Sequence, residues 1–194
     1  MCDTQEMTSF EHIRSAFYQL SSIAMALEDV PKEVRGEVSR LSVQDRELLR
    51  QSHEKMTTRI PNYALSLFIR LFAEHPNYKD IWPQFRAIPD SSLFNSDSLQ
   101  NHAYVYMAGL KSIVAAMEDE ETLCKMCKKI AVSHIKWNIN KYHIEHMVPE
   151  LIGVAEKAGG SMSAEEKCAW TKLYDIIGNL VDYYKKNRLQ SSAS

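Results

Sequence analysis

Two stretches of sequence, LQNHAYVYMAGLKSIVAAM (residues 99–117) and TLCKMCKKIAVSHIKW (residues 122–137), decide the fold class of this chain. In each stretch, apolar side chains recur every three or four residues, which is the spacing of one face of an α-helix. The two faces comprise Leu99, His102, Tyr106, Gly109, Leu110, Ile113 and Met117 in the first stretch and Leu123, Met126, Ile130, His134 and Trp137 in the second. The pattern predicts two consecutive amphipathic helices, each with one histidine on its apolar face.

Helical periodicity continues toward the N-terminus, and no run of alternating residues predicts a strand. Ser42 and Asp45 signal the start of one helix. Pro61 is expected to open the next, because a proline is tolerated in the first helical turn. Residues 77–98 are rich in turn-forming residues and predict a corner instead of a long helix.

Two further helices are expected toward the C-terminus, which makes the class all-α. The first carries apolar residues from Ile144 to Ala155 and contains Pro149, which should kink it. Ser163 and Glu166 form a capping box that opens the last helix. The apolar face of that last helix comprises Trp170, Leu173, Tyr174, Ile177, Val181 and Tyr184.

A leading amphipathic helix is expected over residues 8–29. Its apolar face comprises Phe10, Ile13, Phe17, Leu20, Ile23 and Leu27. Packing on the body of the protein is the favoured use of this face, and a membrane or homodimer surface is the alternative.

The composition is that of one globular domain. The chain has 194 residues, of which 45% are hydrophobic and 25% are charged, values typical of such domains. A formal net charge of -2 gives no electrostatic attraction for nucleic acid. Because no apolar run reaches the roughly 20 residues of a membrane-spanning helix and no signal peptide is recognisable, we expect a cytoplasmic protein without a transmembrane segment.

The two histidines on apolar faces need partners for their ring nitrogens, because an unpaired buried polar group is costly. Taken singly, each is best explained as a core residue bonded to a backbone carbonyl. Taken together, His102 and His134 lie 134 - 102 = 32 residues apart on successive helices. They could then face each other across a slot that holds a flat metallocycle. Imidazole nitrogen is a standard axial ligand of haem iron.

Neighbouring residues could orient and enclose such a site. The carbonyl of Ile130 and the hydroxyl of Ser133 lie within reach of a ring N–H of His134, which would leave the outer nitrogen for ligation. The surrounding apolar side chains could form the wall of a haem pocket, and ordinary core packing explains them equally well. These side chains are Phe68, Phe72, Trp82, Phe85, Tyr106, Ile139 and Ile144.

Residues 41–185 resemble the globin family, most closely its neuroglobin-like and nematode members. LSVQD (41–45), LFIRLF (67–72) and AWTKLY (169–174) resemble the beginning of the first helix, the second helix and the beginning of the last helix of that family. His102 matches the distal position and His134 the proximal position, with the separation usual in the family. Trp82 and Tyr106 are departures, because the family usually has a phenylalanine and a small aliphatic residue there. A phenol at 106 would crowd a bound gas.

The resemblance implies a three-on-three helical sandwich that binds haem b, with His134 as the proximal and His102 as the distal axial ligand of the iron. It implies a non-enzymatic protein whose partners are a diatomic gas (oxygen, carbon monoxide or nitric oxide) or an electron-transfer partner. The chain then divides into an N-terminal extension (1–40), a globin domain (41–187) and a disordered tail (188–194).

The distal histidine distinguishes two functions. If His102 binds the iron directly, a gas must displace it, and the six-coordinate protein suits oxygen or redox sensing or electron transfer. If His102 stands off the iron, the five-coordinate protein stores or carries oxygen. Similarity to neuroglobin-like chains and the bulk of Trp82 and Tyr106 favour the first. A haem-free helical interaction module is the competing class.

Cys124 and Cys127 lie on the helix that carries His134. Lys128 follows them, so the CxxCH motif of covalent haem attachment is absent, and no second CxxC completes a zinc site. Two unrelated thiols are favoured over a redox-switched disulfide.

Overall fold

The computed structural model describes residues 30–59, 62–157 and 160–191. All regular structure in these ranges is helical, which confirms the all-α class. The N-terminal half contains α2 (Lys32–Val38), α3 (Val43–Arg59), α4 (Tyr63–Glu74), η1 (Pro76–Ile81), α5 (Pro83–Arg86) and α6 (Asp90–Leu93). The C-terminal half contains α7 (Asp97–Ala115), α8 (Glu120–Ile135), α9 (Lys141–Glu145), α10 (Met147–Lys157) and α11 (Ala164–Ser191).

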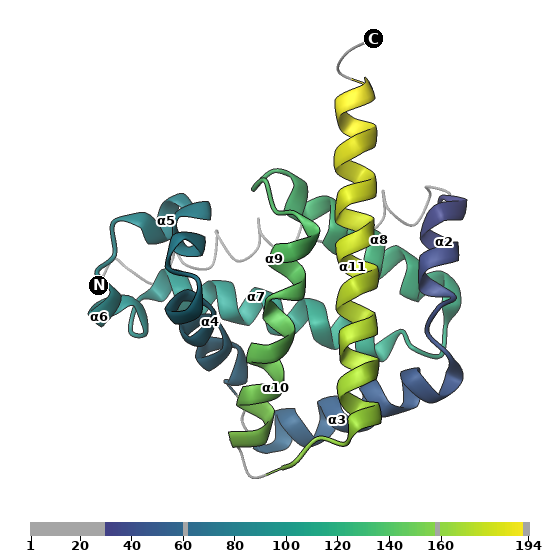
Figure 1. The fold of residues 1–194 in the computed structure, drawn as a ribbon, viewed down its shortest axis with the longest axis horizontal. Helices are drawn as coiled ribbons and strands as arrows, with labels where there is room; N and C mark the ends of the chain where they lie inside the picture. The colour runs from purple at the N-terminus through teal and green to yellow at the C-terminus, as the bar shows by residue number, and fades with distance from the viewer. Residues whose placement is uncertain (1–29, 60–61, 158–159, 192–194) are drawn as a thin grey trace, which may run out of the picture.

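The helices form two layers, with α7 and α8 behind α9, α10 and α11 (Figure 1). α11 packs against α2, α3, α8, α9 and α10, and α4 packs against α7 and α10. The apolar faces meet in one continuous core. Within the described ranges, no helix combines the length and apolarity needed to cross a bilayer.

Side-chain caps fix where the long helices begin. The Ser42 amide donates to Asp45 Oδ2 at 2.9 Å and the Asp45 amide donates to Ser42 Oγ at 3.1 Å. Ser163 and Glu166 make the same reciprocal pair at 2.8 and 3.1 Å. Both predicted start signals are therefore confirmed, because each pair satisfies two backbone N–H groups that the first turn leaves without partners.

The two helices that carry the histidines are capped in a similar way. Ser96 Oγ accepts a hydrogen bond from the Leu99 amide at 3.3 Å at the start of α7. Asp119 Oδ1 accepts one from the Thr122 amide at 3.2 Å at the start of α8. Between α4 and α7 lies the predicted corner, made of the short helices η1, α5 and α6.

Five features differ from the sequence expectations or lie outside the described residues. Residues 32–38, placed in the extension, form α2 and bury Val34 and Val38 completely. The helix expected from Ile144 is divided into α9 and α10, because Pro149 has no N–H to continue the hydrogen bonds of the preceding turn. α11 continues to Ser191, whereas a disordered tail was expected from residue 188. The leading helix over 8–29 and the role of Pro61 concern residues outside the described ranges.

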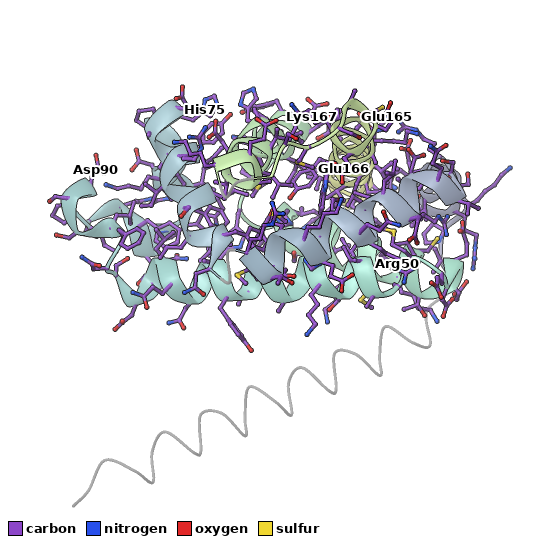
Figure 2. All side chains as sticks on the ribbon, turned by 90° about the horizontal axis from the view of Figure 1, so that it is seen from below. Arg50, His75, Asp90, Glu165, Glu166 and Lys167 are labelled. Atoms are coloured by element: carbon purple, nitrogen blue, oxygen red, sulfur yellow. The ribbon has the colours of Figure 1, made fainter. Side chains whose placement is uncertain are left out.

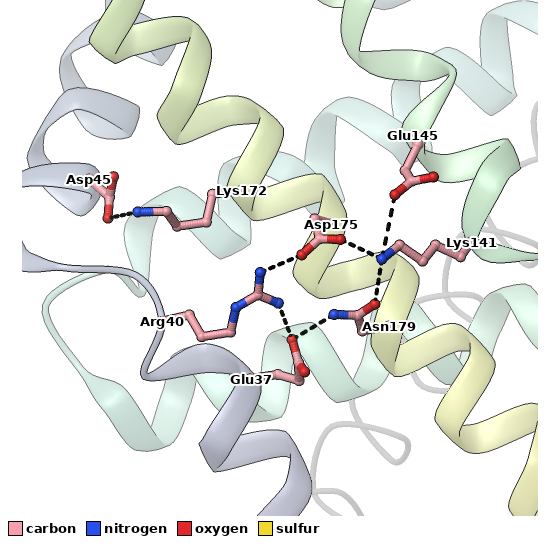
Figure 3. Close-up of polar contacts among 8 residues, drawn as sticks. All are labelled: Glu37, Arg40, Asp45, Lys141, Glu145, Lys172, Asp175 and Asn179. Carbon is pink, nitrogen blue, oxygen red and sulfur yellow. Dashed lines mark hydrogen bonds and ion pairs between the residues drawn. The ribbon is translucent and has the colours of Figure 1, made fainter.

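A polar network holds α9 against α11 and α2 (Figure 3). Lys141 Nζ lies 2.5 Å from Asp175 Oδ1 and 2.7 Å from Asn179 Oδ1. Arg40 bridges Asp175 and Glu37, with 2.5 Å in each ion pair. Burial alone would raise the pKa of Asp175, but hydrogen bonds from Lys141 and Arg40 outweigh burial and lower that pKa. The segment that follows His134 is therefore fixed to the longest helix of the described chain.

Replacing Asp175 with asparagine is expected to lower the free energy of unfolding by about 1 kcal/mol at neutral pH. Because the pKa of Asp175 is lower in the folded than in the unfolded protein, its charge stabilises the fold above the unfolded pKa of about 4. That contribution is lost as the pH falls from there through the folded pKa. Urea unfolding should therefore show a difference between wild type and D175N at pH 7 that shrinks in acid. A constant difference would contradict the ion-pair explanation.

Candidate functional site

The His102 ring, on α7, lies in a cage of aromatic side chains. Its centroid is 4.8 Å from that of Phe68, 5.0 Å from that of Trp82 and 5.5 Å from that of Phe85. Phe72 extends the cage through contacts with Trp82 and Phe85. In the described part of the chain, neither ring nitrogen of His102 has a hydrogen-bond partner. The simpler explanation of this histidine, a core residue bonded to a carbonyl, therefore finds no support.

The surroundings keep His102 neutral. Desolvation by burial lowers the pKa of His102 to about 4, with a smaller contribution from the neighbouring His134. At neutral pH the ring therefore carries one N–H and one free lone pair. A neutral imidazole in an apolar cage has the protonation state that metal ligation requires.

His134, in the last turn of α8, is oriented by its own helix. Its Nδ1 lies 2.7 Å from the carbonyl oxygen of Ile130, and a carbonyl can only accept, so Nδ1 carries the proton. Ser133 Oγ donates to the same carbonyl at 2.7 Å and lies 3.3 Å from Nδ1. Both predicted contacts are confirmed. The tautomer that results leaves the lone pair on Nε2, which has no partner among the described residues.

Burial also lowers the pKa of His134, although the hydrogen bond to Ile130 opposes that shift. Both histidines are thus neutral at pH 7. A hydrogen bond from Nδ1 to a carbonyl makes Nε2 a stronger donor toward a metal. Two neutral imidazoles form this donor set. His134 is oriented by its hydrogen bond to Ile130, and His102 has no polar partner among the described residues. Such a pair fits the axial ligands of an iron porphyrin.

Three further predicted wall residues are Ile130 on α8, Ile139 in the corner after α8 and Ile144 on α9. Ile130 faces α7, because a β-carbon placed on Gly109 would lie 3.5 Å from Ile130 Cδ1. Ile139 and Ile144 are buried in the core, 2% and 4% exposed. Their place in the pocket stays a prediction.

Tyr106 differs from the sequence expectation. Its hydroxyl is hydrogen-bonded to the hydroxyl of Tyr174 on α11, and its ring packs 5.5 Å from Phe68 and 6.4 Å from Tyr63 between centroids. Burial raises the pKa of Tyr106 well above its ordinary value, so the phenol stays protonated. The hydroxyl is therefore tied to α11, not free to crowd a ligand. Sequence reasoning missed Tyr174 as this partner, although Tyr174 was on the predicted apolar face.

Replacing Tyr106 with phenylalanine is expected to lower the free energy of unfolding by about 1–3 kcal/mol, because the buried Tyr174 hydroxyl would lose its partner. The double variant Y106F/Y174F should recover most of that loss, since it removes both polar groups together. Thermal unfolding of the two variants and the wild type measures this. Equal losses in the single and double variants would contradict a shared hydrogen bond.

Cys124 and Cys127 are free thiols in the structure, and both are fully buried in α8. Burial raises the pKa of Cys124 to about 11 and that of Cys127 to about 12. Since the thiolate is the reactive form, both side chains are inert at neutral pH. The structure thus favours two unrelated core thiols over a redox-switched disulfide.

Comparison with known proteins agrees with the helical fold. A family model described as Globin matches residues 65–180. The myoglobin of Heterodontus portusjacksoni is 33% identical over 138 residues, which cover 68% of this chain and 88% of that protein. A variant of the myoglobin of Aplysia limacina has a similar fold, with a TM-score of 0.67 at 17% identity, covering 74% of this chain and 98% of its own. A hexacoordinated heme protein from an anhydrobiotic tardigrade has a TM-score of 0.65 at 17% identity, covering 75% and 96%.

Proposed function

Because this chain belongs to the globin family, we propose that it binds haem b between His102 and His134, with His134 as the proximal ligand. When bound, haem b supplies an iron that takes diatomic gases and exchanges electrons. The observation that carries the proposal is the hydrogen bond from His134 Nδ1 to the Ile130 carbonyl at 2.7 Å. It holds the proton on the inner nitrogen and leaves Nε2 as the donor atom.

His102 acts as the second axial ligand in this proposal, which makes the haem six-coordinate. Three observations support it: the ring is neutral, it is enclosed by Phe68, Trp82 and Phe85, and it lacks a polar partner in the described residues. The aromatic cage excludes water and leaves the iron as the natural partner of the free nitrogen. Similarity in fold to a hexacoordinated heme protein is in keeping with this state.

A six-coordinate globin suits oxygen or redox sensing, or electron transfer. An incoming gas would have to displace His102, so the apparent gas affinity falls with the fraction of closed molecules. Two nitrogen ligands without a thioether favour ferric iron, which gives a low reduction potential. In this role the chain binds and signals, or passes electrons, without turning over a substrate.

Reversible oxygen storage is the second candidate. The sequence identity of 33% with a myoglobin favours it. In that case His102 would donate a hydrogen bond to the gas and leave the iron free. The Tyr106 hydroxyl, tied to Tyr174, would not obstruct the gas.

The optical spectrum of the ferrous, gas-free protein tests the proposal. A low-spin spectrum with sharp, split visible bands is expected if both histidines bind the iron. A high-spin spectrum would instead assign the storage function. A colourless protein that takes up no added hemin would leave only the haem-free interaction module.

A further inference from the structure

A group of rings outside the haem site joins the end of α4 and η1 to α9 and α10. His75 and His146 stack in parallel, with centroids 4.3 Å apart and planes 6° from each other. Tyr78 stacks on His75 at 4.7 Å and contacts His143 at 4.7 Å. Figure 2 shows His75 at the outer edge of the molecule, at the end of α4. These ring contacts thus join residues 75–78 to residues 143–146, which are distant in sequence.

One hydrogen bond in this cluster joins Tyr78 to His146, with Tyr78 Oη 2.7 Å from His146 Nδ1. While His146 is neutral, either atom can supply the proton of this bond. When His146 is charged, Nδ1 carries a proton and the hydroxyl can only accept. A proton on His75 as well places two positive rings face to face at 4.3 Å, where like charges repel strongly.

The charged neighbours do little to offset this repulsion. Desolvation and then the charge of His75 lower the pKa of His146, and Glu145 of α9 is the one group that raises it. Burial also lowers the pKa of His143. The hydrogen bond at Asn140 opposes that shift, and the nearby His146, His75 and Lys185 of α11 add to it. Burial raises the pKa of Tyr78, and Tyr142, also on α9, raises it by a smaller amount. The surroundings therefore favour the neutral stack and resist a second proton.

The stack is connected along the chain to the distal wall of the proposed pocket. The chain runs from Tyr78 along η1 to Trp82 and Phe85, whose rings contact His102. On the other side, Ile144 lies between His143 and His146 and follows the α8 corner after His134. A separation of η1 from α9 would move the aromatic cage of His102 relative to the proximal helix.

We infer that the parallel stack of His75 and His146 is a proton-sensitive joint that holds η1 against the α9–α10 break and loosens the distal wall when both rings are charged. The part concerning the wall rests on the proposed haem function, whereas the joint itself does not. In neutral solution the joint is closed. In mildly acidic solution it opens and retention of the haem weakens.

Titration of the histidine resonances by nuclear magnetic resonance tests the joint in the full chain. In the wild type, the pKa of His146 is expected to lie below its ordinary value, because burial and the neighbouring His75 ring both oppose its charge. In the variant His75→Phe, which keeps a stacking ring but cannot be charged, His146 should titrate in one step at a higher pKa. The same His146 pKa in the wild type and in H75F would overturn the inference.

Amide hydrogen exchange and hemin release test the opening. At about pH 5 the wild type should exchange amides of residues 76–86 and release hemin about tenfold faster than H75F, with no difference at about pH 7.5. H146F should show the same slow exchange and hemin release as H75F at about pH 5. Agreement between the two variants excludes a folding defect of one of them as the cause. Y104L replaces an exposed ring of α7 outside this group of rings and should behave like wild type.

The two proposals fail separately. A protein that takes up no hemin but shows the higher His146 pKa in H75F and faster exchange in acid retains the joint and loses the haem function. A protein that binds hemin but shows the same exchange and release in wild type and H75F at about pH 5 loses the joint alone.

Discussion

Replacing His134 with glycine is expected to reduce hemin affinity by at least about 100-fold and to remove the Soret band of the purified protein. No other described side chain offers a neutral imidazole whose proton is fixed by its own helix carbonyl, as His134 is by Ile130. Loss of the ring removes the donor atom and leaves a space of its size. Hemin titration followed by absorbance at the Soret maximum measures the change.

Imidazole added to His134→Gly is the matched control. The free base can enter the space left by the ring and donate the same kind of nitrogen, so the Soret band should return in its presence. Circular dichroism should show an unchanged helix content in the variant. Full hemin affinity without imidazole would mean that the proximal ligand is another residue.

Replacing His102 with leucine is expected to convert the gas-free ferrous protein from low-spin to high-spin and to speed carbon monoxide binding by about tenfold or more. In the wild type, only molecules whose distal histidine has left the iron can bind the gas. Leucine keeps the apolar contacts with Phe68, Trp82 and Phe85 but has no donor atom. Stopped-flow mixing with carbon monoxide measures the rate.

Tyr104→Leu supplies the control on the same helix, because Tyr104 is 73% exposed on the outer side of α7. Its spectrum and its carbon monoxide rate should match those of the wild type. If His102→Leu also matches the wild type in both, the six-coordinate proposal fails and the storage function takes its place.

Local geometry explains what could be predicted from the sequence. The apolar stripes of α7 and α8, the Ser42 and Ser163 caps and the contact of His134 with the carbonyl four residues earlier depend only on helical spacing. These features were all predicted and are present in the structure. A residue's position on a helix limits its near neighbours to a few, so a single sequence suffices.

Contacts between distant segments could not be predicted in this way. Tyr106 meets Tyr174, and Tyr78 meets His146, each across 68 residues of sequence. Nothing in the spacing of either tyrosine reveals which helix its hydroxyl will reach. The helix α2 was missed for a different reason, since its 7 residues are too few to display a clear period. His143 and His146, three residues apart on one side of the chain, were the available sign of the histidine cluster.

The position of α11 has a consequence for how the protein forms in the cell. It contacts α2, α3, α8, α9 and α10, yet it leaves the ribosome after all of them. The faces that α11 covers in these five helices therefore stay uncovered until α11 has been made. Until then, that exposed apolar surface makes the nascent chain prone to aggregation.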